Sequence, residues 1–260
     1  MSNIRQAFQN GKAFIPFITC GDPDLESTKR NVRAAVAAGA DLVELGIPFS
    51  DPTAEGPVIQ AANLRALSGG VTTDAVFQMV AELREELTTP LVFMTYANVV
   101  FSYGIEHFAA RAAEVGIDGI ILPDVPFEEK EEFAPAFRAV GIDFISMIAP
   151  TSMARIREIA AAAEGFLYVV SSLGVTGVRQ EINTDLSGML ASVRQANPSL
   201  PAAIGFGIST PAQAKRMAAV ADGVIVGSAI VRIMAEKGCE ADEEIARYVR
   251  EMKTAANTFQ

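Results

Sequence analysis

The sequence predicts an α/β protein, a (β/α)8 TIM barrel that forms a single domain over residues 1–260. Short, continuous apolar runs alternate with longer alanine-rich stretches, as in a parallel sheet whose strands are separated by helices. Eight such units in 260 residues fit a closed barrel, which typically takes about 250 residues. A doubly wound open sheet is the alternative, but it usually has fewer strands.

The elements follow in order along the chain. We expect the strands at 13–20, 41–45, 90–96, 119–123, 143–149, 166–170, 201–206 and 222–226. We expect helices between them at 27–38, 73–87, 105–115, 128–139, 152–163, 185–196 and 211–219. Residues that cap helix starts precede three of these segments: Thr72 or Thr73, Thr151 or Ser152, and Ser209-Thr210-Pro211. Glycines stand where three helices should end: Gly39, Gly116 and Gly141.

Composition excludes several classes of function. The net charge is −10 without a basic stripe, so we expect no nucleic-acid partner. Cys20 and Cys239 lie far apart and form no CxxC motif, which fits a reducing compartment. The N-terminal stretch lacks the apolar core of a signal peptide, and no apolar run is long enough to span a membrane. We therefore expect a cytoplasmic protein with no membrane partner.

Because the active sites of such barrels lie at the carboxyl ends of the strands, the residues there are the first candidates. Glu44 is near the end of the second predicted strand, and by alternation it shares a face with Leu42. The apolar pair Val43 and Leu45 suits the helix layer, so Glu44 should point into the barrel mouth. A carboxyl in a poorly solvated lumen has a raised pKa and can serve as a general acid. A buried glutamate with a structural hydrogen-bond partner is the alternative.

Two more carboxylates, Asp51 and Glu55, follow in the loop "GIPFSDPTAEGP". Loop acids are usually solvated, but prolines and glycines restrict the path of this loop above Glu44. A second group of residues follows the last two strands, where Gly205, Gly207 and Gly227-Ser228 bring bare backbone to the mouth. The segment "SAIVRIMA" then predicts a short extra helix, and such loops and helix N-termini often bind phosphate in barrels.

Absences narrow the chemistry further. None of the six lysines falls at the carboxyl end of a strand, which argues against a Schiff-base aldolase. His107 is the only histidine, so we expect no histidine-held zinc and no metal site. No GxGxxG or Walker loop is present. The residues thus indicate proton transfer by carboxylates on a small phosphorylated molecule.

Several motifs also resemble one known family. The stretches "VELGIPFSDPTAEGPVIQ", "MTYAN", "SSLGVTG", "GFGIS" and "DGVIVGSAIV" closely resemble those of tryptophan synthase α subunits. The match is collinear from "FIPFITCGDPD" onward and covers nearly the whole chain. The resemblance implies a carbon–carbon lyase of tryptophan biosynthesis that cleaves indole-3-glycerol phosphate to indole and glyceraldehyde 3-phosphate.

The resemblance also implies roles for particular residues. The barrel glutamate falls on Glu44, the second catalytic carboxylate on Glu55 and the active-site tyrosine on Tyr168. Three residues match the lining of the indole pocket: Phe17, Ile59 and Phe206. Four match the phosphate site: Gly177, Gly207, Gly227 and Ser228. Thr176 matches the lid threonine.

The resemblance implies a partner as well. The family binds a β subunit in a heterotetramer of two α and two β subunits, and the pyridoxal phosphate belongs to that partner, so no cofactor is expected in this chain. Asp51 and Pro52 in the loop after the second strand, and Asp124 in "LPDVP", should border the interface because they flank the mouth.

This chain departs from the usual family motif at three positions. Thr53 stands where a leucine is usual, Glu55 where the catalytic aspartate is usual, and Ser172 where an arginine is frequent. Glu55 keeps the charge but is one methylene longer, and a misplacement near 1 Å can cost on the order of 100-fold in rate. Two alternatives therefore stay open: another phosphate-binding barrel of tryptophan biosynthesis, and a non-catalytic or weakly active activator of a β subunit.

Overall fold

The strands form one parallel sheet. The computed structural model describes residues 2–171 and 186–258, and within them the strand order is β5-β4-β3-β2-β1-β9-β8-β7-β6. The strands are β1 Ala13–Thr19, β2 Val43–Gly46, β3 Leu91–Met94, β4 Gly119–Ile121, β5 Asp143–Phe144, β6 Met147–Ile148, β7 Leu167–Val170, β8 Ala202–Gly205 and β9 Gly223–Val226.

The two ends of this order are joined through the chain itself, which closes the sheet into a barrel. The expected fifth strand over 143–149 is wrong as one continuous strand, since it is divided into β5 and β6. The Ile145 amide donates to Ile120 on one side, whereas the Ser146 carbonyl accepts from Tyr168 on the other. The segment changes neighbours at this point, because β4 pairs with its first half and β7 with its second. The expectation of a (β/α)8 barrel is confirmed, with the fifth strand interrupted.

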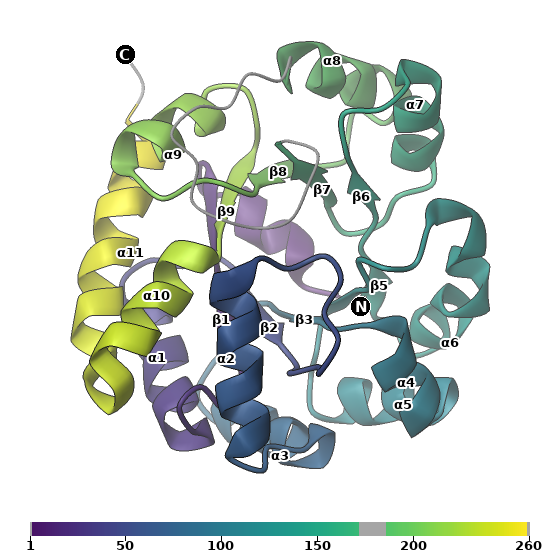
Figure 1. The fold of residues 1–260 in the computed structure, drawn as a ribbon. Coiled ribbons are helices and arrows are strands. Elements are labelled where there is room, and N and C mark those ends of the chain that lie inside the picture. Colours follow the sequence, from purple (N-terminus) through teal and green to yellow (C-terminus); the bar gives the residue numbers. More distant parts are fainter. Residues whose placement is uncertain (1, 172–185, 259–260) are drawn as a thin grey trace.

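Helices surround the strands on all sides (Figure 1). The helices are α1 Leu25–Ala37, α2 Pro57–Ser68, α3 Thr73–Arg84, α4 Ala97–Tyr103, α5 Ile105–Glu114, α6 Ala134–Ala139, α7 Met153–Ala161, α8 Leu186–Ala196, α9 Pro211–Ala218, α10 Ser228–Lys237 and α11 Asp242–Ala256. Three 3-10 helices complete the fold: η1 Ile4–Phe8, η2 Phe127–Glu132 and η3 Gly238–Glu240.

One expected helix differs from the structure. The segment 128–139 is not continuous, because η2 ends at Glu132 and α6 begins at Ala134. Pro135 lies in the first turn of α6, a position where its missing N–H costs no hydrogen bond. Inside a continuous helix the same proline would remove a backbone hydrogen bond and clash with the preceding turn. The extra helix expected from "SAIVRIMA" is confirmed as α10.

Side chains alternate between the inside and the outside of the barrel as the sequence predicts. Leu42 belongs to the inner apolar cluster, together with Ile15 and Val92, whereas Val43 and Leu45 pack in the outer cluster against the helices. This register is what turns Glu44 inward. At the opposite end of the barrel, Ile4 and Ala7 of η1 belong to the inner cluster.

The expected helix caps are confirmed. Thr72, Ser152 and Thr210 are the N-cap residues of α3, α7 and α9, and each hydroxyl accepts from the backbone three residues on. Thr210 forms a full capping box with Gln213. These contacts fix where each helix starts relative to the strand before it.

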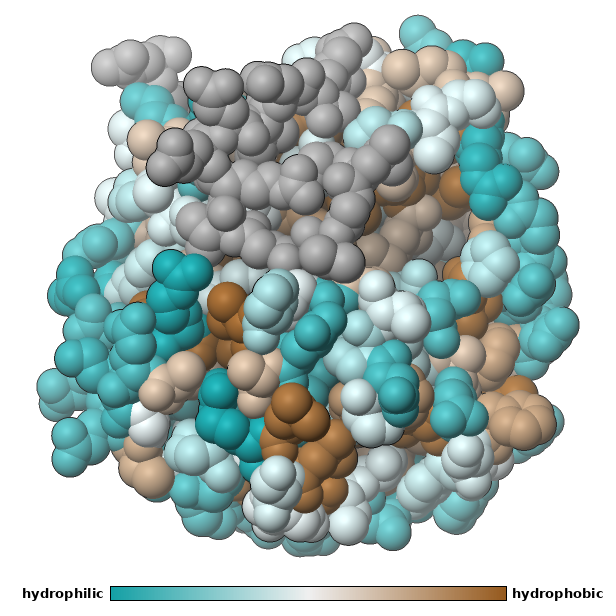
Figure 2. Space-filling view, in the orientation of Figure 1, coloured by the Kyte–Doolittle hydropathy of each residue, from teal (hydrophilic) through white to brown (hydrophobic). Residues whose placement is uncertain are grey.

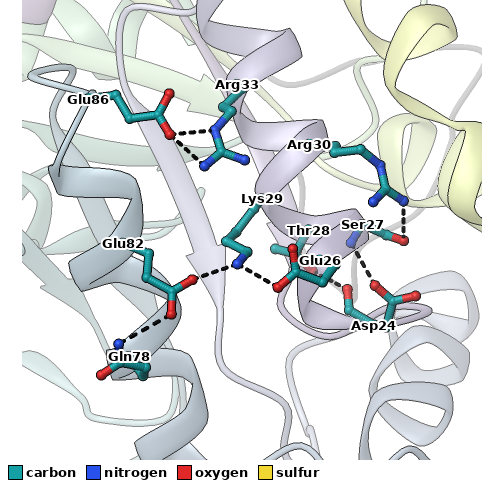
Figure 3. Close-up of polar contacts among 10 residues, drawn as sticks. All are labelled: Asp24, Glu26, Ser27, Thr28, Lys29, Arg30, Arg33, Gln78, Glu82 and Glu86. Carbon is teal, nitrogen blue, oxygen red and sulfur yellow. Dashed lines mark hydrogen bonds and ion pairs between the residues drawn. The ribbon is translucent and has the colours of Figure 1, made fainter.

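Ion pairs join α1 to α3 and to Glu86, which follows α3 (Figure 3). Lys29 lies between Glu26 and Glu82, with each pair at 2.5 Å, and Arg33 contacts Glu86 at the same distance. The Lys29 side chain is mostly buried, so its aliphatic stem packs while the charge stays paired. The network holds two neighbouring outer helices in register.

No helix in the described part of the chain is long and apolar enough to cross a membrane. Every described strand belongs to the one sheet, and we infer on that ground that the described residues form a single domain.

Candidate active site

A cavity opens at the carboxyl ends of the strands. Its lining comes from six strands or the loops that follow them, from α2 and from the start of α10. The lining residues are Phe17, Glu44, Ala54, Glu55, Ile59, Met94, Tyr168, Phe206, Gly207, Ile208, Ile225, Gly227 and Ser228. Figure 2 shows the molecule from the side of Figure 1, with apolar side chains gathered on the outer side of α2. Leu64 of that helix is 60% exposed.

Glu44 is the most deeply buried acid of this cavity. It is 1% exposed, and neither carboxyl oxygen has a hydrogen-bond partner within the described residues. Burial raises the pKa of Glu44 to about 8, and the charge of Glu55 adds to that effect. Burial disfavours the carboxylate because nothing nearby replaces its lost hydration. Glu44 is therefore suited to hold a proton near neutral pH.

Glu55 lies in the same cavity but in a different environment. The loop after β2 folds back so that Glu55 is 6% exposed, and α2 starts two residues later. Asn63 of α2 donates its amide N–H to Glu55 Oε2 at 2.7 Å. Burial raises the pKa of Glu55 to about 7, while the bond from Asn63 acts in the opposite direction.

Two strand glycines make room for the aromatic walls. A Cβ atom on Gly46 would lie 2.5 Å from Phe17 Cζ, and one on Gly205 would lie 2.5 Å from Tyr168 Oη. Both distances are far below van der Waals contact, so a larger residue at either position would displace the ring. Burial raises the pKa of Tyr168, and the charge of Glu44 contributes to the same shift. The phenol therefore stays neutral beside the acid.

The loop after β8 carries unusual backbone. Phe206 has a φ of 73°, in the left-handed region that non-glycine residues rarely adopt, and Gly207 follows with a φ of 77°. Ser171 holds this turn by donating its hydroxyl to the Phe206 carbonyl at 2.7 Å. The Phe206 ring meets Tyr168 edge to face, with centroids 6.1 Å apart. Strained backbone of this kind is concentrated at ligand sites.

The start of α10 forms the other side of the same wall. Gly227 is its N-cap residue and has no capping side chain, and Ser228 is the first residue of the helix. The first amide groups of a helix lack partners within it, and with the helix dipole they favour an anion. Gly227 and Ser228 line the cavity beside Gly207. The arrangement is suited to hold a phosphate by backbone N–H groups.

The loop that carries Asp51 is fixed to the end of β3. Tyr96 stacks on Phe49 and its hydroxyl accepts from the Ala54 amide. Asp124 accepts from the Ala97 amide at the start of α4, next to Tyr96. Asp51 and Asp124 are therefore on adjoining loops of the rim, and neither lines the cavity.

The structure brings nine of the residues singled out from the sequence to this cavity: Phe17, Glu44, Glu55, Ile59, Tyr168, Phe206, Gly207, Gly227 and Ser228. Thr176 and Gly177 lie outside the described residues. Asn63, Gly46 and Met94 were missed by sequence reasoning. Asn63 has polar neighbours in α2, Gln60 and Arg65, so its sequence context gave no signal that set it apart.

Within the described residues, no group of three or more histidine, cysteine, aspartate or glutamate side chains is placed to hold a metal ion. Two buried carboxyls, aromatic walls and an anion-binding corner instead define a barrel enzyme that performs acid–base chemistry on a small anionic aromatic molecule.

Comparison with known proteins agrees with that class. The family model described as "Tryptophan synthase alpha chain" matches residues 2–259. The tryptophan synthase alpha chain of Lacticaseibacillus casei is 48% identical over 257 residues, which cover 99% of this chain and 96% of the relative. The chain belongs to the tryptophan synthase alpha chain family, lyases of tryptophan biosynthesis.

Solved structures show the same fold. Tryptophan synthase subunit alpha from Legionella pneumophila has a TM-score of 0.86 and 35% identity, and the match covers all of both chains. A structure from Pyrococcus furiosus concerns mutual activation of the tryptophan synthase a2b2 complex. It has a TM-score of 0.82 and 35% identity over 94% of this chain and 99% of that one.

Proposed function

We propose that this chain cleaves indole-3-glycerol phosphate to indole and glyceraldehyde 3-phosphate, as the α subunit of a tryptophan synthase. One observation carries the proposal: two buried carboxyls face one cavity, and only one of them accepts a hydrogen bond from a residue that the structure describes. The reaction needs a proton donor and a fixed negative charge in the same small space, and this asymmetry supplies both.

Glu44 acts first as the general acid. It gives its proton to C3 of the indole ring, which becomes a cationic indolenine. The hydroxyl on the side-chain carbon attached to the ring then loses its proton, and its electrons form the aldehyde. The carbon–carbon bond breaks as its electron pair returns to the ring. Glu44 takes up the hydroxyl proton, so the protons balance over one turnover.

Glu55 stabilises the cation that forms in the first step. Positive charge develops toward the ring nitrogen, and a carboxylate next to that nitrogen lowers the energy of the transition state. The side chain of Tyr168, which lines the same cavity as Glu44 and meets the Phe206 ring edge to face, helps to orient the substrate as a third catalytic residue.

The rest of the cavity positions the substrate. The indole ring lies among Phe17, Ile59 and Phe206, which are all buried and apolar. The phosphate binds to backbone N–H groups at Gly207, Gly227 and Ser228, where α10 begins. Thr176 and Gly177, outside the described residues, complete the site in this proposal.

The partner in this proposal is a tryptophan synthase β subunit, in a heterotetramer of two α and two β subunits. Asp51, Pro52 and Asp124 lie on adjoining rim loops, where a partner would receive indole. Pyridoxal phosphate belongs to that partner, and this subunit needs no cofactor. We place the complex in the cytoplasm.

The direct test is incubation with indole-3-glycerol phosphate, with and without a β subunit, followed by an assay for indole. We expect indole in both cases and faster release with the β subunit. Asp51→Ala should lower the stimulation while leaving the melting temperature unchanged. An absence of indole under both conditions, together with activation of the β reaction, would identify a non-catalytic activator instead.

A further inference from the structure

Asn63 is the only described residue that donates a side-chain hydrogen bond to the Glu55 carboxyl. It is 3% exposed and belongs to α2, about two turns after the helix starts. Asn63 is itself outside the set of residues that line the cavity, so it does not touch a bound substrate directly. Its influence on the reaction would pass through Glu55.

The position of Asn63 is fixed from two sides. Arg65, two residues further along α2, donates two hydrogen bonds to the buried Asp22, at 2.8 and 2.7 Å. This bidentate contact ties α2 to the loop after β1. Near the start of the helix, Gln60 donates to the Glu55 carbonyl at 2.7 Å. The amide of Asn63 is thus held beside Glu55 by the barrel rather than by a flexible loop.

The donor creates a difference between two otherwise similar acids. An amide N–H donates a hydrogen bond and cannot give up its proton, so it stabilises a carboxylate over a neutral carboxyl. Glu44 has no such donor on either oxygen within the described residues. When the two carboxyls together hold one proton, the hydrogen bond from Asn63 therefore favours the state in which Glu44 is protonated and Glu55 is charged.

We infer that Asn63 is a positioning residue, which fixes Glu55 as the charged member of the pair and keeps the transferable proton on Glu44. The inference rests on the proposed cleavage reaction for its consequence in catalysis. It also explains how a glutamate serves where the family usually has an aspartate: Asn63 anchors the end of the longer side chain against α2.

Few other charges act on the pair. Glu44 on β2 and Tyr96 after β3 act on Glu55 or are acted on by it, and Tyr168 on β7 interacts with Glu44; no lysine, arginine or histidine is among the described residues that line the cavity. Burial raises the pKa of both tyrosines, so both phenols stay neutral when the carboxyls titrate. Of the described residues that line the cavity, Glu44 and Glu55 are the ones that change charge between pH 5 and 9.

Removing the donor should therefore alter both titrations. Without Asn63 the pKa of Glu55 rises above about 7, because burial then acts unopposed. A neutral Glu55 no longer repels charge on Glu44, so the pKa of Glu44 falls from about 8. The proton is then shared between the two carboxyls, and a smaller fraction of the molecules has a protonated Glu44 beside a charged Glu55.

The test compares Asn63→Leu with Gln60→Leu. Each change removes a side-chain amide of α2 that donates a hydrogen bond to Glu55. Asn63→Leu removes the bond to the carboxyl of Glu55, whereas Gln60→Leu removes the bond to its backbone carbonyl. Carbon-13 NMR of labelled glutamate carboxyls gives both titration midpoints without substrate, with Glu44→Gln and Glu55→Gln as assignment variants. The second readout is kcat and KM for indole release against pH, with a saturating β subunit.

For Asn63→Leu we expect the Glu55 midpoint to rise and the Glu44 midpoint to fall. We also expect kcat to drop at least about tenfold, with KM changed less than about threefold, since a hydrogen bond to a charged group is affected. Gln60→Leu should leave both midpoints in place, because the two hydrogen bonds from Arg65 to Asp22 still hold α2, and with it Asn63. If Asn63→Leu does not fold, Asn63→Ala gives the same titration.

Unchanged midpoints in Asn63→Leu, or an equal shift in Gln60→Leu, would overturn the inference. The titration separates it from the proposed function. If the parent protein forms no indole while the midpoints move as expected, the proposed reaction is wrong and the role of Asn63 in placing the proton stands.

Discussion

At the scale of single residues, the contrast between Glu44 and Glu55 shows how environment assigns chemistry. Both are glutamates, both are nearly inaccessible to solvent, and both line one cavity. A single amide, from Asn63, distinguishes them. In the proposed reaction, Glu44 is the acid because it is buried without a partner among the described residues, and the bond from Asn63 favours the charged form of Glu55.

Glu55→Gln tests the role of that charge. The amide oxygen of glutamine can still accept from Asn63, so shape and hydrogen bonding survive while the charge is lost. We expect kcat to fall about 100-fold, as for the loss of one electrostatic stabiliser, with a small change in KM. Glu55→Asp should keep measurable activity because the charge is retained. Turnover of Glu55→Gln at the parental rate would remove Glu55 from the reaction.

The phosphate corner is tested at Gly227. Its backbone is not left-handed, and the atom nearest to an added Cβ would be Phe17 Cβ at 3.4 Å, an ordinary contact, so Gly227→Val should fold. The larger side chain should block the backbone N–H groups, so that KM for indole-3-glycerol phosphate and the dissociation constant of glycerol phosphate rise severalfold or more. Gly207→Val is less informative, because the φ of 77° would strain any valine. Unchanged binding of glycerol phosphate to Gly227→Val would place the phosphate elsewhere.

Several residue-scale features followed from the sequence, and others did not. The inward direction of Glu44 follows from two-residue alternation within one strand, which is a local property. The burial of Glu55 depends on a loop folding back onto Tyr96, and its contact with Asn63 crosses from that loop to a helix. The need for glycine at Gly46 arises from a ring on the neighbouring strand. Such contacts between distant parts of the chain leave no periodic signal.

At the scale of elements, apolar runs located the strands, and capping residues located the helix starts. Apolar content alone did not reveal where the fifth strand divides, because Ile145 and Ser146 have the same strand-like character as their neighbours. The strand is divided because its first half, β5, pairs with β4, whereas its second half, β6, pairs with β7. Pro135 was a local signal for the break between η2 and α6, and the predicted helix over 128–139 ran through it.

The capping box of α9 gives a prediction at this scale. Thr210 accepts from the Gln213 amide, and the Gln213 side chain accepts from the Thr210 amide. Thr210→Ala removes one of these contacts and should lower the free energy of unfolding by about 1 kcal/mol. Thr210→Ser keeps a hydroxyl and should lose little. Urea unfolding of the three proteins checks this, and identical midpoints for Thr210→Ala and the parent would contradict it.

At the scale of the whole molecule, the buried acids should make stability depend on pH. The folded-state pKa values of Glu44 and Glu55, about 8 and about 7, lie above the ordinary value of 4.5. The folded protein therefore binds more protons than the unfolded chain between about pH 4.5 and 8. Because stability falls with pH wherever the folded state binds more protons, this contribution is complete below pH 4.5 and lost as pH rises through 8.

The comparison with Glu44→Gln isolates that effect. At pH 5 Glu44 is neutral in the folded protein, so the variant and the parent should have similar stability. At pH 9 the parent holds a buried charge with no hydrogen-bond partner among the described residues, and the variant should be more stable by a few kcal/mol. Urea unfolding at both pH values measures the difference, and a difference that does not change with pH would contradict the assignment.

The proposal as a whole depends on Glu44 supplying the proton that breaks the carbon–carbon bond. The most direct measurement is the rate of indole release from indole-3-glycerol phosphate by Glu44→Gln, with a saturating β subunit and the parent protein alongside. The amide keeps the size of the side chain but has no acidic proton to transfer. We expect a folded variant whose rate is at least about 1000-fold below that of the parent. A rate within a few-fold of the parent would contradict the proposed mechanism.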